Sequence, residues 1–193
     1  MAQFQYVCCV WNVRGLRSRV EEVEVLSKRA DICGLGETRL RPDITFDLPD
    51  FVVYRNDRGA GVLLAVRQSV PHRPFAIAEC PGMVVVAAQV WHERGWVLVV
   101  AMYVSGVFSA RDWEEWLGSL PQPLLLCGDF NAHHRLWGSD RQNGRGAVIA
   151  ASLCNQDLVV LNDGTSTFVR WFGVGPRDLF PFYGWSSDGC CGR

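Results

Sequence analysis

The stretch that decides the fold is LLLCGDFNAHHRLWGS (124–139). It opens with four apolar residues, 124–127, which are bounded by Pro121, Pro123 and Gly128. Such a run is too short for a helix and predicts a buried strand. An acid, an amide and two histidines follow it almost at once. Chemistry at the end of a buried strand sits on a rigid element, which is where α/β and layered β folds carry their sites.

Other apolar, β-rich runs predict further strands along the chain. We expect strands at residues 6–13, 32–35, 51–54, 62–66, 83–90, 96–103, 158–161 and 165–171, with a hairpin between the two long runs at 83–90 and 96–103. Many strands with only a few helices indicate two packed sheets with helices outside.

Two capping-box spacings predict where helices begin. Ser18 with Glu21 predicts a helix that runs to about Ala30, and Ser109 with Asp112 predicts a second. A third is expected at 147–154, with two glycines near its start. The predicted core faces hold Val23, Leu26 and Ala30 on the first helix and Trp113, Trp116, Leu117 and Leu120 on the second. The tryptophans are most simply core packing rather than base-stacking residues.

Composition bounds the class of protein. The 193 residues suit one domain, and 49% of them are apolar, enough for a sizeable core. The net charge of −1 gives no global basic field, so any contact with a polyanion must be local or mediated by a metal. No basic, apolar signal peptide begins the chain, and its longest apolar run, 96–104, is too short to cross a membrane. We expect an intracellular protein, nuclear or cytoplasmic, without membrane contact and monomeric.

The eight cysteines include no C-x-x-C pair and so predict no zinc site. Cys8, Cys9, Cys33 and Cys127 fall in apolar strand-like runs. We interpret them as buried thiols of a reducing compartment.

Polar residues end three of the predicted strands. The first run ends at Asn12, the second at Glu37, and the strand at 124–127 is followed by Asp129 and Asn131. Mg²⁺ prefers hard oxygen ligands, usually one or two carboxylates with water and substrate phosphate. The two acids can supply the carboxylates and the amides can orient water or a phosphate oxygen. A metal would also supply the positive charge that the chain lacks.

Four motifs, in order, carry a resemblance to a known family. They are WNVRGL (11–16), LGETRL (35–40), AMYVSG (101–106) and GDFNAHH (128–134), and they resemble the endonuclease/exonuclease/phosphatase, or DNase I-like, superfamily. The strings GDFNAHHRLWGSDRQNGRG and LVVLNDGTSTF resemble most closely the endonuclease domains of non-LTR (LINE-type) retrotransposons.

The resemblance implies a four-layer α/β sandwich of two packed, mostly antiparallel sheets flanked by helices. It implies cleavage of a DNA phosphodiester with Mg²⁺ (or Mn²⁺). By family role, Glu37 would hold the metal together with Asn12, and Asp129 would orient or deprotonate the attacking water. Asn131 would hold a phosphate oxygen, and Tyr103 would stabilise the phosphate.

Each of these residues has an ordinary structural alternative. Asn12 could cap a turn before Gly15, and Glu37 could be a surface acid paired with Arg39. Tyr103 alone is more often a core residue, and Asp and Asn also start turns.

The loop after the strand adds candidates for substrate binding, with Arg14 from the first motif. His133 and His134 could suggest a metal pair, but adjacent residues seldom point the same way. We expect them to line a DNA-facing loop or to cap a helix. Asn143 and Arg145 could touch phosphate, and an ordinary solvated loop is an equal alternative.

The C-terminal part departs from the family pattern. The family's final segment carries a Ser-Asp-His, and here Ser187-Asp188 is followed by Gly189, with no histidine after His134. Asp178 is a weak candidate for a supporting acid. We predict an incomplete domain over 1–171 without its final strands, and a divergent tail over 172–193 that need not fold.

These features leave three hypotheses for function. The first is an Mg²⁺-dependent endonuclease weakened by loss of the histidine, which would cost about 10²–10⁴ in rate. The second is a phosphatase of the same superfamily. The third is an inactive fragment that only binds nucleic acid or a partner.

Overall fold

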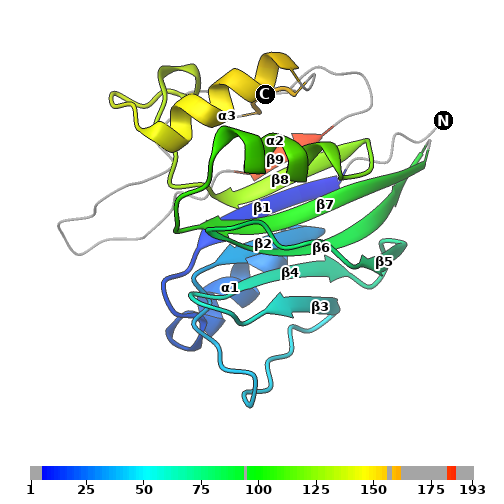
Figure 1. The fold of residues 1–193 in the computed structure, drawn as a ribbon. Helices are drawn as coiled ribbons and strands as arrows, with labels where there is room; N and C mark the ends of the chain where they lie inside the picture. The colour runs from blue at the N-terminus through cyan, green and yellow to red at the C-terminus, as the bar shows by residue number, and fades with distance from the viewer. Residues whose placement is uncertain (1–5, 94, 156–157, 162–181, 186–193) are drawn as a thin grey trace.

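The computed structural model describes residues 6–93, 95–155, 158–161 and 182–185 (Figure 1). Two sheets make up its centre. In the first sheet the strand order is β3-β4-β2-β1-β9, and in the second it is β5-β6-β7-β8. The strands of the first sheet are β1 (Tyr6–Asn12), β2 (Ile32–Gly36), β3 (Phe51–Asn56), β4 (Val62–Arg67) and β9 (Phe182–Trp185). Those of the second are β5 (His72–Phe75), β6 (Met83–His92), β7 (Gly95–Val104) and β8 (Leu124–Asp129).

Each sheet contains one parallel pair among antiparallel neighbours. β1 and β2 run parallel in the first sheet, and β7 and β8 run parallel in the second. The β6–β7 hairpin pairs His92 with Gly95, as predicted. The fold class predicted from sequence, two mostly antiparallel sheets with helices outside, is therefore confirmed.

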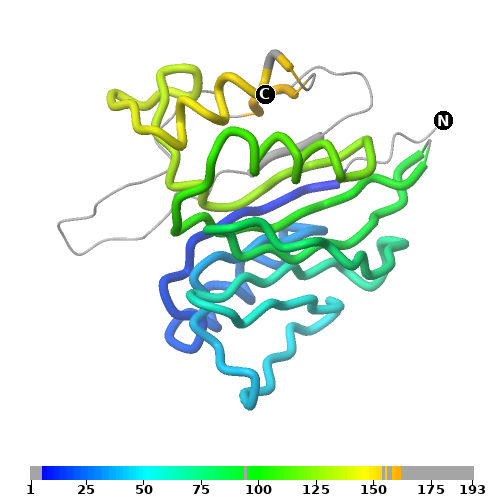
Figure 2. The backbone as a smooth tube through the Cα atoms, in the orientation of Figure 1, coloured from blue at the N-terminus to red at the C-terminus, as the bar shows by residue number. Residues whose placement is uncertain are grey.

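Helices cover the two outer faces. They are α1 (Val20–Ser27), α2 (Ala110–Gly118) and α3 (Gly144–Asn155), with short 3-10 turns at Leu16–Ser18 and Arg135–Trp137. α2 and α3 lie together on one side of the strands (Figure 1). In the tube of Figure 2 the cyan segment near residue 50 lies at the far end of the molecule from α3.

Three apolar clusters correspond to the three interfaces of a four-layer sandwich. One joins α1 to the first sheet through residues such as Val23, Leu26, Cys9 and Cys33. One joins α2 and α3 to the second sheet through Trp113, Trp116, Val100 and Ile149. The third lies between the sheets and includes Cys8, Leu64, Val99 and Cys127. Successive residues of a strand face opposite sides, so Cys8 and Cys9 belong to different clusters.

The predicted thiols are buried. Cys8, Cys9, Cys33 and Cys127 are all free and buried, as is Cys80. Burial raises the pKa of the Cys33 thiol to about 12. No helix within the described ranges has the length and apolar character needed to span a bilayer.

One of the two capping boxes is confirmed and the other is wrong. Ser109 and Asp112 cap α2 reciprocally, and the predicted stripe on that helix is buried. Ser18 instead ends a 3-10 turn, and its hydroxyl donates to the carbonyl of Gly15 at 3.0 Å. α1 begins at Val20 with Arg19 in the N-cap position and no side-chain cap, so Ser18 lies one residue too early to cap it.

Three strand predictions need correction. Leu124–Leu126 are half-buried rather than buried, because β8 ends its sheet among the described residues. Residues 158–161 form no strand, and the Leu158 amide instead donates to the Leu153 carbonyl at the end of α3. β5 was not predicted because it contains Pro74, which an edge strand tolerates.

The C-terminal prediction is wrong at one place. We expected no core strand after residue 172, yet β9 pairs antiparallel with β1 from Tyr6↔Trp185 to Cys9↔Phe182. Its sequence FYGW is rich in aromatic residues that favour strands, and Pro181 comes just before it, where a proline costs no ladder hydrogen bond. The predicted strand at 165–171 and the segment around Asp178 lie outside the described residues.

Candidate active site

The candidate residues meet because they end parallel strands. Asn12 is the last residue of β1, Glu37 follows β2, and Asp129 is the last residue of β8. Tyr103 lies opposite Asp129 in the β7–β8 register. The carboxyl ends of a parallel pair share one edge of a sheet, and the two sheets face each other. Residues separated by more than 100 positions therefore gather at one end of the sandwich.

Asn12 bridges the two acids. Its side-chain nitrogen Nδ2 donates to Glu37 Oε1 at 2.8 Å and to Asp129 Oδ2 at 2.7 Å. Its Oδ1 accepts the backbone amide of Arg14 at 3.3 Å, so the turn-capping alternative is also observed. Both carboxylates thus point at one position, which is filled here by the N–H groups of an amide.

Glu37 is held by several partners and adopts a left-handed backbone. Its φ is 51°, and Oε2 accepts from Arg39 Nη2 at 2.7 Å. Burial alone would raise the pKa of this carboxyl, but hydrogen bonds from Asn12, Arg39 and Tyr103 outweigh burial and lower it. The pair with Arg39 that we considered as an alternative is present, and it does not exclude a place in the site. Strained backbone conformations of this kind are found most often at functional sites.

Tyr103 is a hydroxyl donor at neutral pH. Burial and the negative charge of Glu37 raise the pKa of its hydroxyl. Asp129 raises it further, and a hydrogen bond with Asn131 acts in the opposite direction. Tyr103 is therefore in contact with the site and is more than a core residue.

The loop after β8 holds Asp129 and Asn131 in a fixed arrangement. The Asn131 amide donates to Asp129 Oδ1 at 2.9 Å, and Asn131 Nδ2 donates to the Val104 carbonyl at 3.0 Å. Asn131 has a φ of 46°, in the left-handed region. A Cβ at Gly128 would lie 1.9 Å from the Met102 carbonyl oxygen, so only glycine fits this approach.

The two histidines make different contacts within the loop. His133 Nδ1 lies 3.3 Å from the Ser139 hydroxyl. His134 Nδ1 accepts the Leu136 amide at 3.2 Å and so caps the 3-10 turn that follows, which confirms the capping alternative for His134. No cluster of three or more His, Cys, Asp or Glu residues suited to a metal occurs in the part of the chain that the structure describes.

The remaining substrate-binding candidates lie around the site. Their contact with substrate stays a prediction. Arg14 is exposed just after β1, at a φ of 50°. Asn143 precedes α3 and Arg145 lies in its first turn, where Arg145 Nη1 donates to the Val104 carbonyl at 3.1 Å. Sequence reasoning missed Val104, because a backbone carbonyl leaves no signal in residue type.

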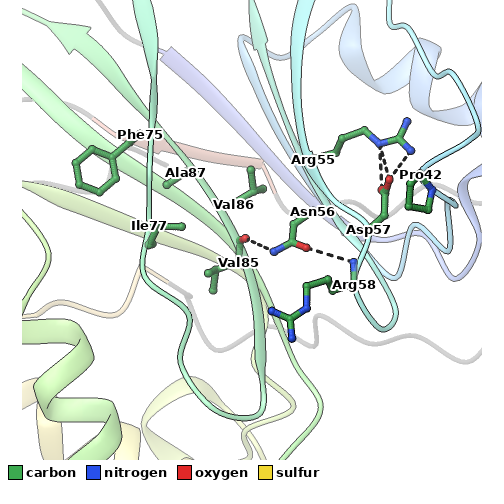
Figure 3. Close-up of a pocket in the computed structure, with 10 residues that line it drawn as sticks. All are labelled: Pro42, Arg55, Asn56, Asp57, Arg58, Phe75, Ile77, Val85, Val86 and Ala87. Atoms are coloured by element: carbon green, nitrogen blue, oxygen red, sulfur yellow. Dashed lines mark hydrogen bonds and ion pairs between the residues drawn. The ribbon is translucent and has the colours of Figure 1, made fainter.

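An open pocket of about 400 Å³ lies between the end of β3 and the strand β6 (Figure 3). Asn56 and Asp57 contribute to it from the end of β3, and Val85 and Ala87 contribute from β6. Asn56 Nδ2 donates to the Val85 carbonyl at 3.0 Å, joining the two walls. Neither Glu37 nor Asp129 lines the pocket, so it is separate from the candidate site.

Comparison with known proteins identifies the family of the chain. The model of the Endonuclease/Exonuclease/phosphatase family matches residues 9–192. The chain belongs to this family.

Curated relatives within the family come from mobile elements. The chain is 27% identical over 169 residues to the probable RNA-directed DNA polymerase from transposon X-element of Drosophila melanogaster, covering 82% of this chain and 18% of that protein. It is 25% identical over 172 residues to the RNA-directed DNA polymerase from mobile element jockey of the same organism, covering 84% and 19%. The chain thus spans under a fifth of the length of these relatives.

Solved structures share the fold. The endonuclease domain of TRAS1, a telomere-specific non-LTR retrotransposon, superposes with a TM-score of 0.64 at 18% identity, over 84% of this chain and 76% of that one. The catalytic domain of APE2 from Xenopus laevis gives 0.54 at 15% identity, over 76% and 67%. At these identities the likeness establishes the DNase I-like sandwich.

The residues present fit the divalent metal that the family implies. Glu37 and Asp129 each direct a carboxylate at the Asn12 side chain, whose Oδ1 is a further hard oxygen, so the three residues gather oxygen donors at one end of the sandwich. This is the donor set that suits Mg²⁺ or Mn²⁺, with water and substrate phosphate as further ligands.

Proposed function

We propose that this chain is a Mg²⁺-dependent endonuclease domain of a non-LTR retrotransposon-type protein and that it nicks DNA. The observation that carries the proposal is the Asn12 bridge, which holds two carboxylates from different sheets at one position. Membership of the family and the mobile-element polymerases among the relatives support the substrate class.

Each side chain of the site would have a separate role in the cleavage. Glu37, with Asn12, would hold the metal, which when bound supplies positive charge against the phosphate. Asp129 would orient the attacking water and accept its proton, since each carboxylate oxygen has lone pairs beyond the hydrogen bond that it already accepts. Tyr103, which lies opposite Asp129 in the strand register, and Asn131, whose amide donates to Asp129, would contact the phosphate oxygens.

Cleavage that leaves a 3′-hydroxyl would suit the polymerases that the relatives are named for. Such an end can prime DNA synthesis, which is the role that we propose for the nick. The product is therefore part of the proposal, and it can be read directly by extending nicked plasmid with a DNA polymerase.

A weakened or absent activity is the second candidate. The sequence has no histidine after His134, and the family pattern ends in one. A missing general acid or electrostatic group would lower the rate by about 10²–10⁴. A chain that still binds DNA but does not cleave it would match the hypothesis of an inactive fragment.

The test is nicking of supercoiled plasmid by the purified chain, with Mg²⁺, with Mn²⁺ or with EDTA. The proposal predicts relaxed circles that form only with the metal and that a polymerase can extend. Hydrolysis of a phosphomonoester without nicking would instead support the phosphatase alternative. DNA binding that needs no metal, without nicking, would support the inactive fragment.

A further inference from the structure

Asn143 makes five hydrogen bonds to the loop after β8 and to the start of α3, one of which runs from the Ala147 amide to its backbone carbonyl at 3.0 Å. Its Oδ1 accepts the His133 amide at 3.1 Å and the Gly146 amide at 2.8 Å. Its Nδ2 donates to the Asn131 carbonyl at 2.9 Å, and its backbone amide donates to the His133 carbonyl at 3.1 Å. Both polar atoms of the side chain are therefore used inside the protein.

We propose that Asn143 is a positioning residue for the proposed cleavage, and that it acts on Asp129 through Asn131. The inference rests on the proposed function. Asn143 Nδ2 fixes the Asn131 carbonyl, and the amide of Asn131 donates to Asp129 Oδ1 at 2.9 Å. Two hydrogen bonds thus connect the start of α3 to the acid that would take the proton from water.

The packing of α3 against the loop supports the same positioning role. A Cβ at Gly146 would lie 2.0 Å from the His133 carbonyl oxygen, so the helix approaches the loop as closely as glycine allows. Arg145 Nη1 and Asn131 Nδ2 both donate to the Val104 carbonyl, at 3.1 and 3.0 Å. Asn131, with a φ of 46° in the left-handed region, is held on both sides by these contacts.

This role replaces the substrate contact that the sequence suggested for Asn143. A residue that contacts substrate keeps a polar atom for it, and a phosphate contact changes affinity more than turnover. A positioning residue changes turnover, because a displacement of about 1 Å at a catalytic group can cost about 10²-fold in rate.

The test compares Asn143→Asp with Asn143→Ala. Aspartate keeps the acceptor for the His133 and Gly146 amides and remains a strong helix N-cap, so it should preserve the start of α3. It loses the donor to the Asn131 carbonyl and sets a carboxylate oxygen against that carbonyl. Alanine loses both functions. Ser109→Ala, which removes the N-cap of α2, is the matched control for loss of a cap alone.

The readouts are kcat and KM for plasmid nicking, Tm, and hydrogen exchange of residues 129–134. Asn143→Asp should keep a Tm close to that of the parent chain and an unchanged KM, while its kcat falls by about 10- to 100-fold. Exchange of 129–134 should be faster in both Asn143 variants and unchanged in Ser109→Ala.

Three results would overturn the inference. They are a parental kcat in Asn143→Asp, a raised KM with unchanged kcat, and unchanged exchange of 129–134. If the parent chain does not nick DNA, the proposed function fails by itself. The exchange of 129–134 then decides whether Asn143 still fixes the loop.

Discussion

Asn12 and Asp129 are joined by a 2.7 Å hydrogen bond although 117 residues separate them. Each ends a strand, one in each sheet, so the bond closes the sandwich at the candidate site. The same Asn12 nitrogen also donates to Glu37. One neutral amide therefore lies between two carboxylates, which is an arrangement that added positive charge would stabilise and added negative charge would disrupt.

Asn12→Asp should make stability depend on a divalent cation. A third carboxylate at this position repels the other two, and Mg²⁺ bound to the folded state would offset that repulsion. We expect a lower Tm in EDTA and a larger rise in Tm on adding Mg²⁺ than in the parent chain. Asn56→Asp, which alters an amide at the end of β3, is the matched control. Equal Mg²⁺ effects in the two variants would contradict the two-acid site.

Glu37 should contribute to acid unfolding. Its pKa is lowered in the folded state, so its contribution is present above the pKa of an unfolded glutamate, about 4.3, and is lost as the pH falls toward the folded value. In Glu37→Gln this titration is gone. In urea unfolding with EDTA, the parent chain should lose more unfolding free energy between about pH 5 and 3 than Glu37→Gln does. Parallel pH profiles for the two proteins would show that Glu37 is not held as described.

Thr38 should tolerate loss of its hydroxyl. The residue is 1% exposed, and its Oγ1 has no hydrogen-bond partner within the described residues. A buried hydroxyl without a partner costs about 1–3 kcal/mol, and valine has nearly the same shape. Thr38→Val should therefore raise the unfolding free energy by about 1 kcal/mol in urea titrations. A loss of stability would mean that the hydroxyl has a partner.

The strands and the meeting of the acids were predictable from sequence for a common reason. Apolar runs mark strands, and polar residues placed where strands end gather when those strands run parallel. Asn12, Glu37 and Asp129 satisfy both conditions. The buried stripe of α2 followed from its spacing in the same way.

Other features depend on contacts that residue type does not encode. Ser18 has the spacing of a cap, but it ends a 3-10 turn and α1 begins with Arg19 as its N-cap residue. The Val104 carbonyl receives two side chains, and no pattern marks a backbone acceptor. β9 forms because β1 is available as its partner. Its sequence is only four residues long and rich in aromatics, and so short a run shows no periodicity that would predict a strand.

The central claim is tested most directly by single-turnover nicking of supercoiled plasmid with Mg²⁺ by Asp129→Asn. Asp140→Asn, an exposed acid in the loop that follows, is the matched control. The account predicts that Asp140→Asn nicks like the parent chain and that Asp129→Asn is slower by about 10²-fold or more while binding the same DNA equally well. Equal nicking rates for the two variants would contradict the site built on Asn12, Glu37 and Asp129.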